Sequence, residues 1–445
     1  MNATQDVIIR LLGNIGSRKE VEQYLRHYAS VDAPKFAVVK TSGKIVDDAL
    51  DALASSLTFL QRVGLVPVVV HGGAVQIDRA LEAARIDVPR IRGLRPMTPA
   101  VLEVARRVLH ETNVKLVEAL EAMGTRTRPF TSGVFEAKAH RDEKLGLMGE
   151  VTHVRDAAIV SAARSGYLPV LTSLGETSTG QSVVIHADAA ARALALVIKP
   201  HKIVYLTEDG ALANADGTPR NAVNLTEDYD ELVKDSRLAA DSLNRLGEIK
   251  AMLDELPPTS SVSITSPENL AKELFTHRGA GTLVRRGERV GRYPSFAEID
   301  QGRLKDLLEL CFGKKLSPTY FETKNPIAIY LTDSYRAAAI VTEENGVPYL
   351  DKFAVTPEAQ GEGIGGSIWK RMRRDHPKIF WRARAQNPVN DWYAQSSDGL
   401  YKTEHWWVFW CGMTDFAEIE RSVKHALAMP ATLKPTAPVP SEPSR

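Results

Sequence analysis

The sequence predicts an α/β protein of two domains: a mainly parallel sheet sandwiched by helices, followed by a smaller mixed α/β domain. Three observations support this fold class. Short apolar runs alternate with helical stretches from residue 36 to about 286, as in chains whose helices cover both faces of a parallel sheet. Beyond residue 287, antiparallel strand patterns and aromatic residues dominate. The length of 445 residues allows about two to four domains.

Charge and composition exclude several classes of function. The chain has 56 Lys and Arg against 55 Asp and Glu, so it lacks the positive excess of most nucleic-acid-binding proteins. Its 2 cysteines are too few for a disulfide framework. The first residues do not resemble a secretory signal, and no apolar run approaches the roughly 20 residues of a membrane span. We therefore expect a soluble, cytoplasmic protein with no nucleic-acid partner, no membrane partner and no metal-ligating residues of its own.

The first domain is expected at residues 31–286. Its clearest strands are residues 36–39, 66–70, 168–171 and 203–206. Between the first two, apolar residues at spacings of three and four predict one helix over residues 46–60. A second helix should begin with Thr98 as its cap and Pro99 in its first turn.

The second domain is expected at residues 296–428, with the boundary near residues 286–296. A helical stretch ends at Gly313, and antiparallel strands should follow at residues 328–331 and 337–341. All 6 tryptophans of the chain lie in this domain.

Two end segments flank the domains. Residues 1–30 have the pattern of an amphipathic helix, which could serve oligomer contacts or simply pack on the first domain. Residues 430–445 contain five prolines in sixteen positions, so we expect this tail to be disordered.

Two glycine-containing loops follow neighbouring strands of the first domain. Lys40 begins the loop after the first strand, and Gly72 and Gly73 follow the second. Ligands bind at the carboxyl edge of a parallel sheet, where small residues let backbone N–H groups approach phosphate oxygens and a following helix adds its positive end. Each loop alone could be a tight turn, and the first differs from a Walker A loop. Together they predict a phosphoryl-transfer site.

Seven motifs in order resemble those of the amino-acid kinase family, in particular the N-acetylglutamate kinases, over about residues 36–286. They are the two loops and residues 93–98, 166–170, 187–190, 205–210 and 247–250. The resemblance implies an amino-acid kinase fold. It also implies that ATP, with Mg²⁺, phosphorylates the carboxylate of N-acetylglutamate.

The resemblance implies roles for the charged residues of these motifs. Lys40 and Lys250 would stabilise the transferring phosphoryl oxygens, and Asp188 would hold the two lysines in position. Phosphoryl transfer depends on such positive charge along the in-line path. In the alternative interpretation, Asp188 caps its helix and Lys250 is a solvated helix lysine.

The same resemblance implies substrate contacts. Gly72 and Gly73 would donate backbone N–H groups to the γ-phosphoryl group or to the attacking carboxylate. Arg95 would clamp the α-carboxylate of the substrate, because the planar guanidinium can donate two parallel hydrogen bonds. A surface ion pair is the other interpretation of Arg95.

Three departures from the family pattern bear on the kinase. Ser42 and Ala74 stand where the family usually has glycine, and Val184 stands where bacterial acetylglutamate kinases have a substrate-binding Asn. Because both lysines, the aspartate, the arginine and two glycines remain, we expect an active kinase. The alternative is a kinase-like domain that only senses arginine and regulates a synthase.

A glycine-rich turn enters a helix in the second domain, and such a turn cradles anions. Its pattern Gln360-x-x-Gly363-x-Gly365 resembles the pyrophosphate loop of the GNAT superfamily of acyl-CoA N-acetyltransferases. The resemblance implies acetyl-CoA as co-substrate, with its thioester carbonyl on backbone N–H groups near Phe353 and Val355. The implied pyrophosphate-loop residues are Gln360, Gly361, Gly363, Gly365 and Gly366.

Arg382 and Arg384 should point to the same face, because side chains alternate along an extended segment. Two adjacent guanidinium groups repel unless an anion lies between them. A dicarboxylate such as glutamate would satisfy the pair, whereas a wet sheet face is the other possibility.

Residues 297–425 closely resemble the vertebrate-type N-acetylglutamate synthase domain. The resemblance implies that Tyr393 donates a proton to the leaving thiolate, although a core aromatic would also fit. The groups implied to hold the carboxylates of L-glutamate are Lys352, Arg382, Arg384 and Asn387, with Lys314 or Lys315.

The order of the two modules resembles the bifunctional N-acetylglutamate synthase/kinases of bacterial arginine biosynthesis over nearly the entire chain. The resemblance implies both activities on separate sites. It also implies L-arginine as feedback effector and a homo-oligomer, a dimer or a tetramer.

Overall fold

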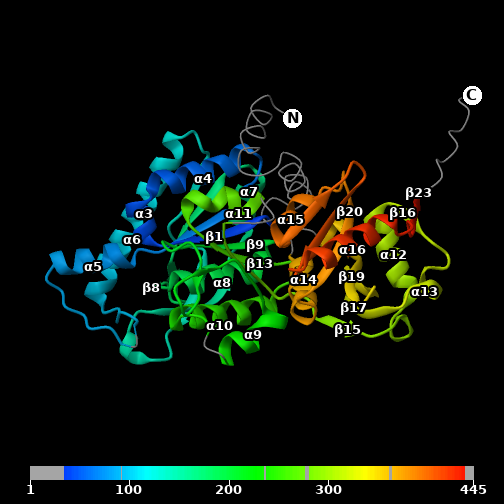
Figure 1. Ribbon diagram of the computed structural model, residues 1–445. Coiled ribbons are helices and arrows are strands. Elements are labelled where there is room, and N and C mark those ends of the chain that lie inside the picture. Colours follow the sequence, from blue (N-terminus) through cyan, green and yellow to red (C-terminus); the bar gives the residue numbers. More distant parts are fainter. Residues whose placement is uncertain (1–34, 92, 235–236, 276–279, 360–362, 436–445) are drawn as a thin grey trace, which may run out of the picture. The chain divides into compact units, whose positions relative to one another are not determined.

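The computed structural model describes residues 35–91, 93–234, 237–275, 280–359 and 363–435 (Figure 1). Contacts divide the chain into two compact units between Arg286 and Gly287. The amphipathic helix expected at residues 1–30 lies outside the described residues. No helix of the described ranges has the length and apolarity needed to cross a membrane.

The first unit is built on an eight-stranded sheet of order β12-β14-β13-β9-β1-β2-β6-β3. Its pairs are parallel except β13 with β14, and all four strands predicted for this domain are present. The fold class predicted from the sequence is thus confirmed for this unit. The strands are β1 (Ala37–Thr41), β2 (Val68–His71), β3 (Thr127–Phe130), β6 (Leu168–Thr172), β9 (Lys202–Leu206), β12 (Ala222–Asn224), β13 (Ser261–Thr265) and β14 (Gly281–Arg285).

Helices cover both faces of this sheet (Figure 1). Along β1, Val39 packs with α4 and α11, whereas Val38 packs on the opposite side with α8, because successive side chains alternate. The helices are α3 (Gly43–Asp48), α4 (Leu50–Arg62), α5 (Ala74–Ala83), α6 (Pro99–Ala122), α7 (Ala157–Arg164), α8 (Ala187–Ile198), α9 (Leu225–Lys234), α10 (Ala240–Glu255) and α11 (Leu270–Phe275).

The helix predicted over residues 46–60 is two helices, so that prediction was wrong in one respect. Ser42 caps α3 by accepting a hydrogen bond from the backbone N of Ile45, and the chain leaves helical geometry at Ala49 (φ −135°) before α4 begins. The apolar spacing runs through this break, so it could not reveal it. The helix predicted after Thr98 is present, with Thr98 accepting from Val101 N.

Short strands extend from the main sheet of the first unit. One group forms a four-stranded sheet of order β5-β4-β7-β8, and another forms a hairpin. These strands are β4 (Phe135–Ala139), β5 (Gly149–Val154), β7 (Leu174–Glu176), β8 (Ser182–Val184), β10 (Leu212–Ala213) and β11 (Pro219–Arg220).

The second unit contains a seven-stranded sheet of order β15-β17-β18-β19-β20-β22-β21. Its neighbours are antiparallel except β19 and β20. The strands are β15 (Val290–Tyr293), β17 (Pro326–Thr332), β18 (Ala337–Glu344), β19 (Val347–Val355), β20 (Ile379–Arg384), β21 (Gly399–Lys402) and β22 (Trp406–Cys411). The helices are α12 (Gln301–Phe312), α13 (Tyr320–Thr323), α14 (Ile364–Asp375), α15 (Asn390–Ser396) and α16 (Phe416–Ala428).

The second unit extends beyond the expected residues 296–428 at both ends. Strand β15 pairs with β17, so the sheet already begins before residue 296. Beyond residue 428, β23 (Leu433–Pro435) pairs with β16 (Lys314–Leu316), although the tail from residue 430 was expected to be disordered. Proline content correctly discourages a helix here, but a short edge strand tolerates proline. Residues 436–445 lie outside the described residues.

Candidate active sites

The loops predicted to bind phosphate converge at one edge of the first sheet. Lys40 on β1 is in register with Val70 on β2 and Tyr205 on β9, so the segments that follow these strands leave side by side. The packing leaves little room for side chains: a Cβ atom on Gly43 would lie 2.8 Å from the Cα of Gly73. The edge is therefore lined by backbone, as a phosphate-binding surface requires.

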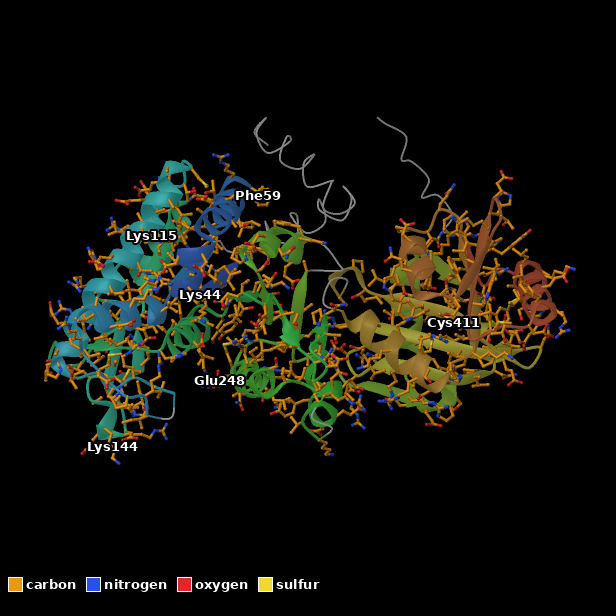
Figure 2. The ribbon with its side chains drawn as sticks, turned by 60° about the vertical axis from the view of Figure 1, so that its left-hand side comes forward. Lys44, Phe59, Lys115, Lys144, Glu248 and Cys411 are labelled. Carbon is orange, nitrogen blue, oxygen red and sulfur yellow. The ribbon has the colours of Figure 1, made fainter. Side chains whose placement is uncertain are left out.

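Three helices hold these loops in place. Asp47 of α3 accepts hydrogen bonds from Arg79 of α5 and from Lys115 of α6, each at 2.9 Å. Figure 2 labels Lys115 on α6 and Lys44 on the neighbouring α3. The carbonyl of Gly43 also accepts a hydrogen bond from the Gln76 amide at 2.6 Å. The two glycine loops are thus tied to each other through α3 and α5.

Lys40 and Asp188 form an ion pair at this edge. The Lys40 ammonium lies 2.7 Å from a carboxylate oxygen of Asp188, which stands in the first turn of α8. Burial would raise the pKa of Asp188, but the charges of Lys40, His186 and Arg245 outweigh it and lower that pKa. The cap of α8 is His186, whose side chain accepts from Asp188 N, so Asp188 is not the capping residue.

Lys250 is not brought to Asp188 in this structure. Its ammonium bonds to Asp254 one turn further along α10, at 2.6 Å, and lies 5.5 Å from the ring centroid of Tyr229. The α10 cation whose charge lowers the pKa of Asp188 is Arg245. The sequence motif pointed to the lysine, and nothing in the local pattern marked the arginine five residues earlier.

A buried histidine braces the glycine loop after β2. Asn113 of α6 donates from its amide to Nε2 of His71 at 3.1 Å and also to the carbonyl of Val170. Burial lowers the pKa of His71 to about 4, so the ring is neutral at pH 7. Because Nε2 accepts, the ring proton is on Nδ1, which donates to the Gly72 carbonyl at 3.1 Å. Sequence reasoning missed Asn113, since a single polar residue in a helix carries no signal.

Arg95 is buried, with 6% of its side chain exposed, but it also forms an ion pair with the half-exposed Asp78. Its guanidinium pairs with Asp78 and donates to the carbonyl of Ala74 at the start of α5, at 3.2 Å. Val184 is also buried, in an apolar cluster with Met97 and Leu109. The position at which the family resemblance led us to expect a substrate-binding Asn is therefore part of the apolar core here.

In the second unit, strands β19 and β20 separate after a short contact. Among the described residues they are in register only at Tyr349 and Phe380. Helix α14 begins beside β19 with Gly363 in the left-handed region (φ 66°). A Cβ atom on Gly365 would lie 3.0 Å from Val355, so glycine permits the close approach of helix and strand. A Cβ on Gly366 would meet nothing within 4 Å.

Two of the predicted pyrophosphate-loop residues, Gln360 and Gly361, lie outside the described residues. The remaining ones enter α14 as expected, since the glycines start the helix whose N-terminus would face an anion.

Tyr393 of α15 lies in an aromatic cluster beside the separating strands. Burial raises the pKa of its phenol, so the hydroxyl keeps its proton at neutral pH. A protonated, buried phenol fits both the proton-donor and the core-aromatic interpretation. The rings that contact Tyr393 are those of Phe353, Trp369, Trp381, Trp392 and Phe409.

Lys352 is buried against a carboxylate because β19 carries a bulge. Ile340 of β18 is opposite Lys352 and Val341 is opposite Leu350, so Asp351 is an extra residue in β19. Such a bulge redirects side chains, and here the Lys352 ammonium meets the Asp351 carboxylate at 2.6 Å. Tyr320 of α13 donates a further hydrogen bond to Asp351, also at 2.6 Å.

Arg382 and Arg384 do share a face, as strand alternation predicts. Their guanidinium carbons lie 4.1 and 4.0 Å from the ring centroid of Trp406 on β22. The expectation that only an anion could relieve their repulsion was wrong, because the negative face of the indole attracts both cations. Sequence reasoning could not see Trp406, which comes from the next strand of the sheet.

The other residues predicted to bind the glutamate carboxylates are less available for a ligand than Lys352 and Arg382. Lys315 points to solvent and pairs with Glu309 at 2.6 Å. Lys314 is half-buried in β16. Asn387 lies in the turn before α15, where its side-chain oxygen accepts from Val389 N at 3.1 Å.

In the first unit, glycines line one edge of the sheet beside the Lys40–Asp188 pair, as in proteins that transfer a phosphoryl group. In the second unit, strands β19 and β20 separate next to a helix that begins with glycines, as in proteins that bind acyl-CoA. The sequence comparisons agree with both. Residues 35–251 match the model of the amino acid kinase family, and residues 291–428 match that of the N-acetyltransferase of N-acetylglutamate synthase.

Individual relatives span both units. The acetylglutamate kinase of Xylella fastidiosa is 45% identical over 419 residues, which is 94% of this chain and 100% of the relative. The mitochondrial N-acetylglutamate synthase of Homo sapiens is 32% identical over 421 residues, 93% of this chain and 76% of the relative. The chain belongs to the acetylglutamate kinase family, in the form that carries the acetyltransferase domain of N-acetylglutamate synthase.

Solved structures show the same fold. The N-acetylglutamate synthase of Neisseria gonorrhoeae in complex with coenzyme A and N-acetyl-glutamate has a TM-score of 0.61 at 19% identity, over 89% of this chain and 98% of that chain. The same enzyme in complex with coenzyme A and L-arginine has a TM-score of 0.57, with the same identity and coverage.

Proposed function

We propose that the second unit acetylates L-glutamate with acetyl-CoA and that the first unit phosphorylates the resulting N-acetylglutamate with ATP. The chain is a bifunctional enzyme of arginine biosynthesis, and the product of one reaction is the substrate of the other. One observation carries this proposal. Each unit has a turn or loop in which glycines precede a helix, where an anion can bind, and each has a Lys–Asp ion pair, Lys40–Asp188 in the first and Lys352–Asp351 in the second.

In the kinase reaction, the substrate carboxylate attacks the γ-phosphorus of ATP and ADP leaves with the bond electrons. Lys40 would neutralise charge on the transferring group, and the backbone N–H groups of Gly72 and Gly73 would bind its oxygens. Mg²⁺ would arrive with ATP as part of the co-substrate. We assign the second cation of the site to Arg245, whose charge acts on Asp188, in preference to Lys250. Arg95 would hold the α-carboxylate.

In the acetyltransferase reaction, the neutral α-amine of glutamate attacks the thioester carbonyl, the C–S bond breaks, and the proton that the amine loses replaces the one that Tyr393 gives up. Backbone N–H groups near Phe353 and Val355 would bind the oxyanion, and Tyr393 would return a proton to the departing CoA thiolate. Lys352 and Arg382 would attract the carboxylates of glutamate. Burial raises the pKa of Tyr393, so the phenol is protonated before the reaction, as an exposed phenol also is at pH 7.

The test is to give the purified chain each substrate pair and measure ADP release and CoA release separately. Turnover of both pairs supports the proposal, whereas turnover of neither would refute it. ADP release at background level, with normal CoA release, would leave the first unit as a regulatory module.

We further propose L-arginine as a feedback effector, supported by the L-arginine complex of the Neisseria synthase, which has the same fold. The homo-oligomer and the cytoplasmic location stay predictions.

A further inference from the structure

Residues 430–435, here called the C-terminal strap, meet three of the groups predicted to hold the glutamate carboxylates. The carbonyl of Pro430 accepts from Arg382 at 3.0 Å, and the Thr432 hydroxyl accepts from Lys352 at 2.7 Å. Leu433–Pro435 pairs with Lys314–Leu316. These groups come from three different strands, β20, β19 and β16, so their meeting on one segment is not a consequence of sequence proximity. The matched acetyltransferase range ends at residue 428, before the strap.

The Lys352 ammonium donates hydrogen bonds to Asp351, its neighbour in β19, and to the Thr432 hydroxyl, which lies outside that strand. The ammonium has three protons, and the structure provides three acceptors: the Asp351 carboxylate at 2.6 Å, the Asp351 carbonyl at 3.2 Å and Thr432 at 2.7 Å. A lysine stem has four rotatable bonds, so the position of its charge depends on such acceptors. The ammonium also lies 5.0 Å from the ring centroid of Tyr320. Without the Thr432 hydroxyl, the buried ammonium would lose one of its three oxygen acceptors.

The strap is itself fixed to the body of the unit. The backbone N of Ser317 donates to the Thr432 carbonyl at 3.0 Å, adjacent to the β16–β23 pairing. Arg382 donates both to Pro430 and to the carbonyl of Ala426 in the last turn of α16, at 2.6 Å. The segment is thus anchored on either side of Thr432, which gives its hydroxyl a defined place.

The charged side chains around Lys352 carry an excess of one positive charge. The described side chains of this cluster include the cations Lys324, Lys352 and Arg382 and the carboxylates Glu344 and Asp351. Lys324 lies 3.4 Å from Glu344 and 3.5 Å from Asp351, so it links the two carboxylates. Three positive charges against two negative ones favour the binding of a carboxylate from outside.

We propose that Thr432 is a positioning residue for Lys352 and that the C-terminal strap forms one wall of the acceptor-carboxylate site. The inference rests on the proposed acetylation of glutamate. In this arrangement the strap does not touch the thioester. It holds the cation that attracts the amino-acid carboxylate, so its loss weakens the binding of glutamate and not that of acetyl-CoA.

The test compares Thr432→Val, which removes the hydroxyl at nearly constant shape, with Thr432→Ser, which keeps it. In the full chain, Thr432→Val should raise KM for glutamate about tenfold, with KM for acetyl-CoA and the kinase parameters unchanged. Thr432→Ser should restore KM to near the wild-type value. Thr414→Val, a change of an exposed threonine in the same unit, is the matched control.

A double substitution tests whether the effect passes through Lys352. Because Lys352→Met is expected to lack CoA release, this comparison uses the dissociation constant of glutamate, measured by calorimetry with CoA bound. In a Lys352→Met background, Thr432→Val should cause no further rise of that dissociation constant. CoA binding measured by calorimetry reports whether each variant keeps the fold of the second unit. An unchanged or lowered KM for glutamate in a folded Thr432→Val chain would overturn the inference, as would equal effects in both backgrounds. Absence of CoA release by the wild-type chain would instead refute the proposed function.

Discussion

Single residues decide which charges face the reacting groups in each unit. Lys40 and Asp188 meet as the family resemblance implied, because both stand at the carboxyl edge of the same sheet. Lys250 could not be placed from sequence, since the direction of a helix residue depends on how the helix is turned. Its ammonium bonds to Asp254, and Arg245 acts on Asp188 instead.

Substitution of the two α10 cations distinguishes these assignments. If Arg245 is the second cation of the site, Arg245→Ala should lower kcat of the kinase reaction about 10²-fold, because a positive charge that acts on Asp188 is lost. Lys250→Ala should leave kcat within about threefold, because an exposed helix ion pair contributes little. The measurement is ADP release at saturating substrates, with CoA release as the control for folding. The reverse order of effects would return the role to Lys250.

The neutral state of His71 has a signature in the pH dependence of stability. Its pKa in the folded chain is about 4, below the usual value near 6.5, so the unfolded chain takes up a proton first as the pH falls. The free energy of unfolding should therefore decrease from about pH 6.5 to about pH 4. Urea unfolding of wild type and His71→Gln at pH 7 and pH 5 checks this. The variant should lose less stability over this interval, and an equal loss in both would contradict the assignment.

At the scale of elements, apolar periodicity predicted the strands and most helices, but it could not predict local irregularities. The break at Ala49, the bulge at Asp351 and the strand at Leu433–Pro435 leave the apolar pattern unchanged. The bulge and the strand at Leu433–Pro435 depend on pairing with residues distant in sequence, whereas the backbone hydrogen bonds of Ala49 are to Ile45 and Leu53. The bulge matters most for function, because it turns the Lys352 and Asp351 side chains toward each other.

The ion pair at the bulge should contribute to the free energy of unfolding of the second unit. Asp351→Asn should destabilise the second unit by about 3 kcal/mol, because it leaves the buried Lys352 ammonium without its countercharge. Glu420→Gln breaks an exposed ion pair with Lys424 in the same unit and should leave its stability nearly unchanged. Thermal unfolding of both variants provides the comparison. A similar loss in the two would mean that the Lys352–Asp351 pair is not buried as described.

At the scale of the whole molecule, the order of motifs predicted two units of different fold class, and both are present. Strand order predicted the position of the two glycine loops, and the family resemblance implied the Lys40–Asp188 pair. The aromatic and carbonyl partners of Arg382, such as Trp406 and Pro430, could not be predicted, since they come from other strands and from a segment expected to be disordered.

The most direct test of two separate active sites measures ADP release and CoA release in one preparation of wild type, Lys40→Met and Lys352→Met. Each substitution removes a lysine from one Lys–Asp pair and leaves the other pair intact. Lys40→Met should abolish ADP release and leave CoA release unchanged, and Lys352→Met should do the opposite. Loss of both activities from either substitution in a folded chain, or of neither from both, would contradict the account.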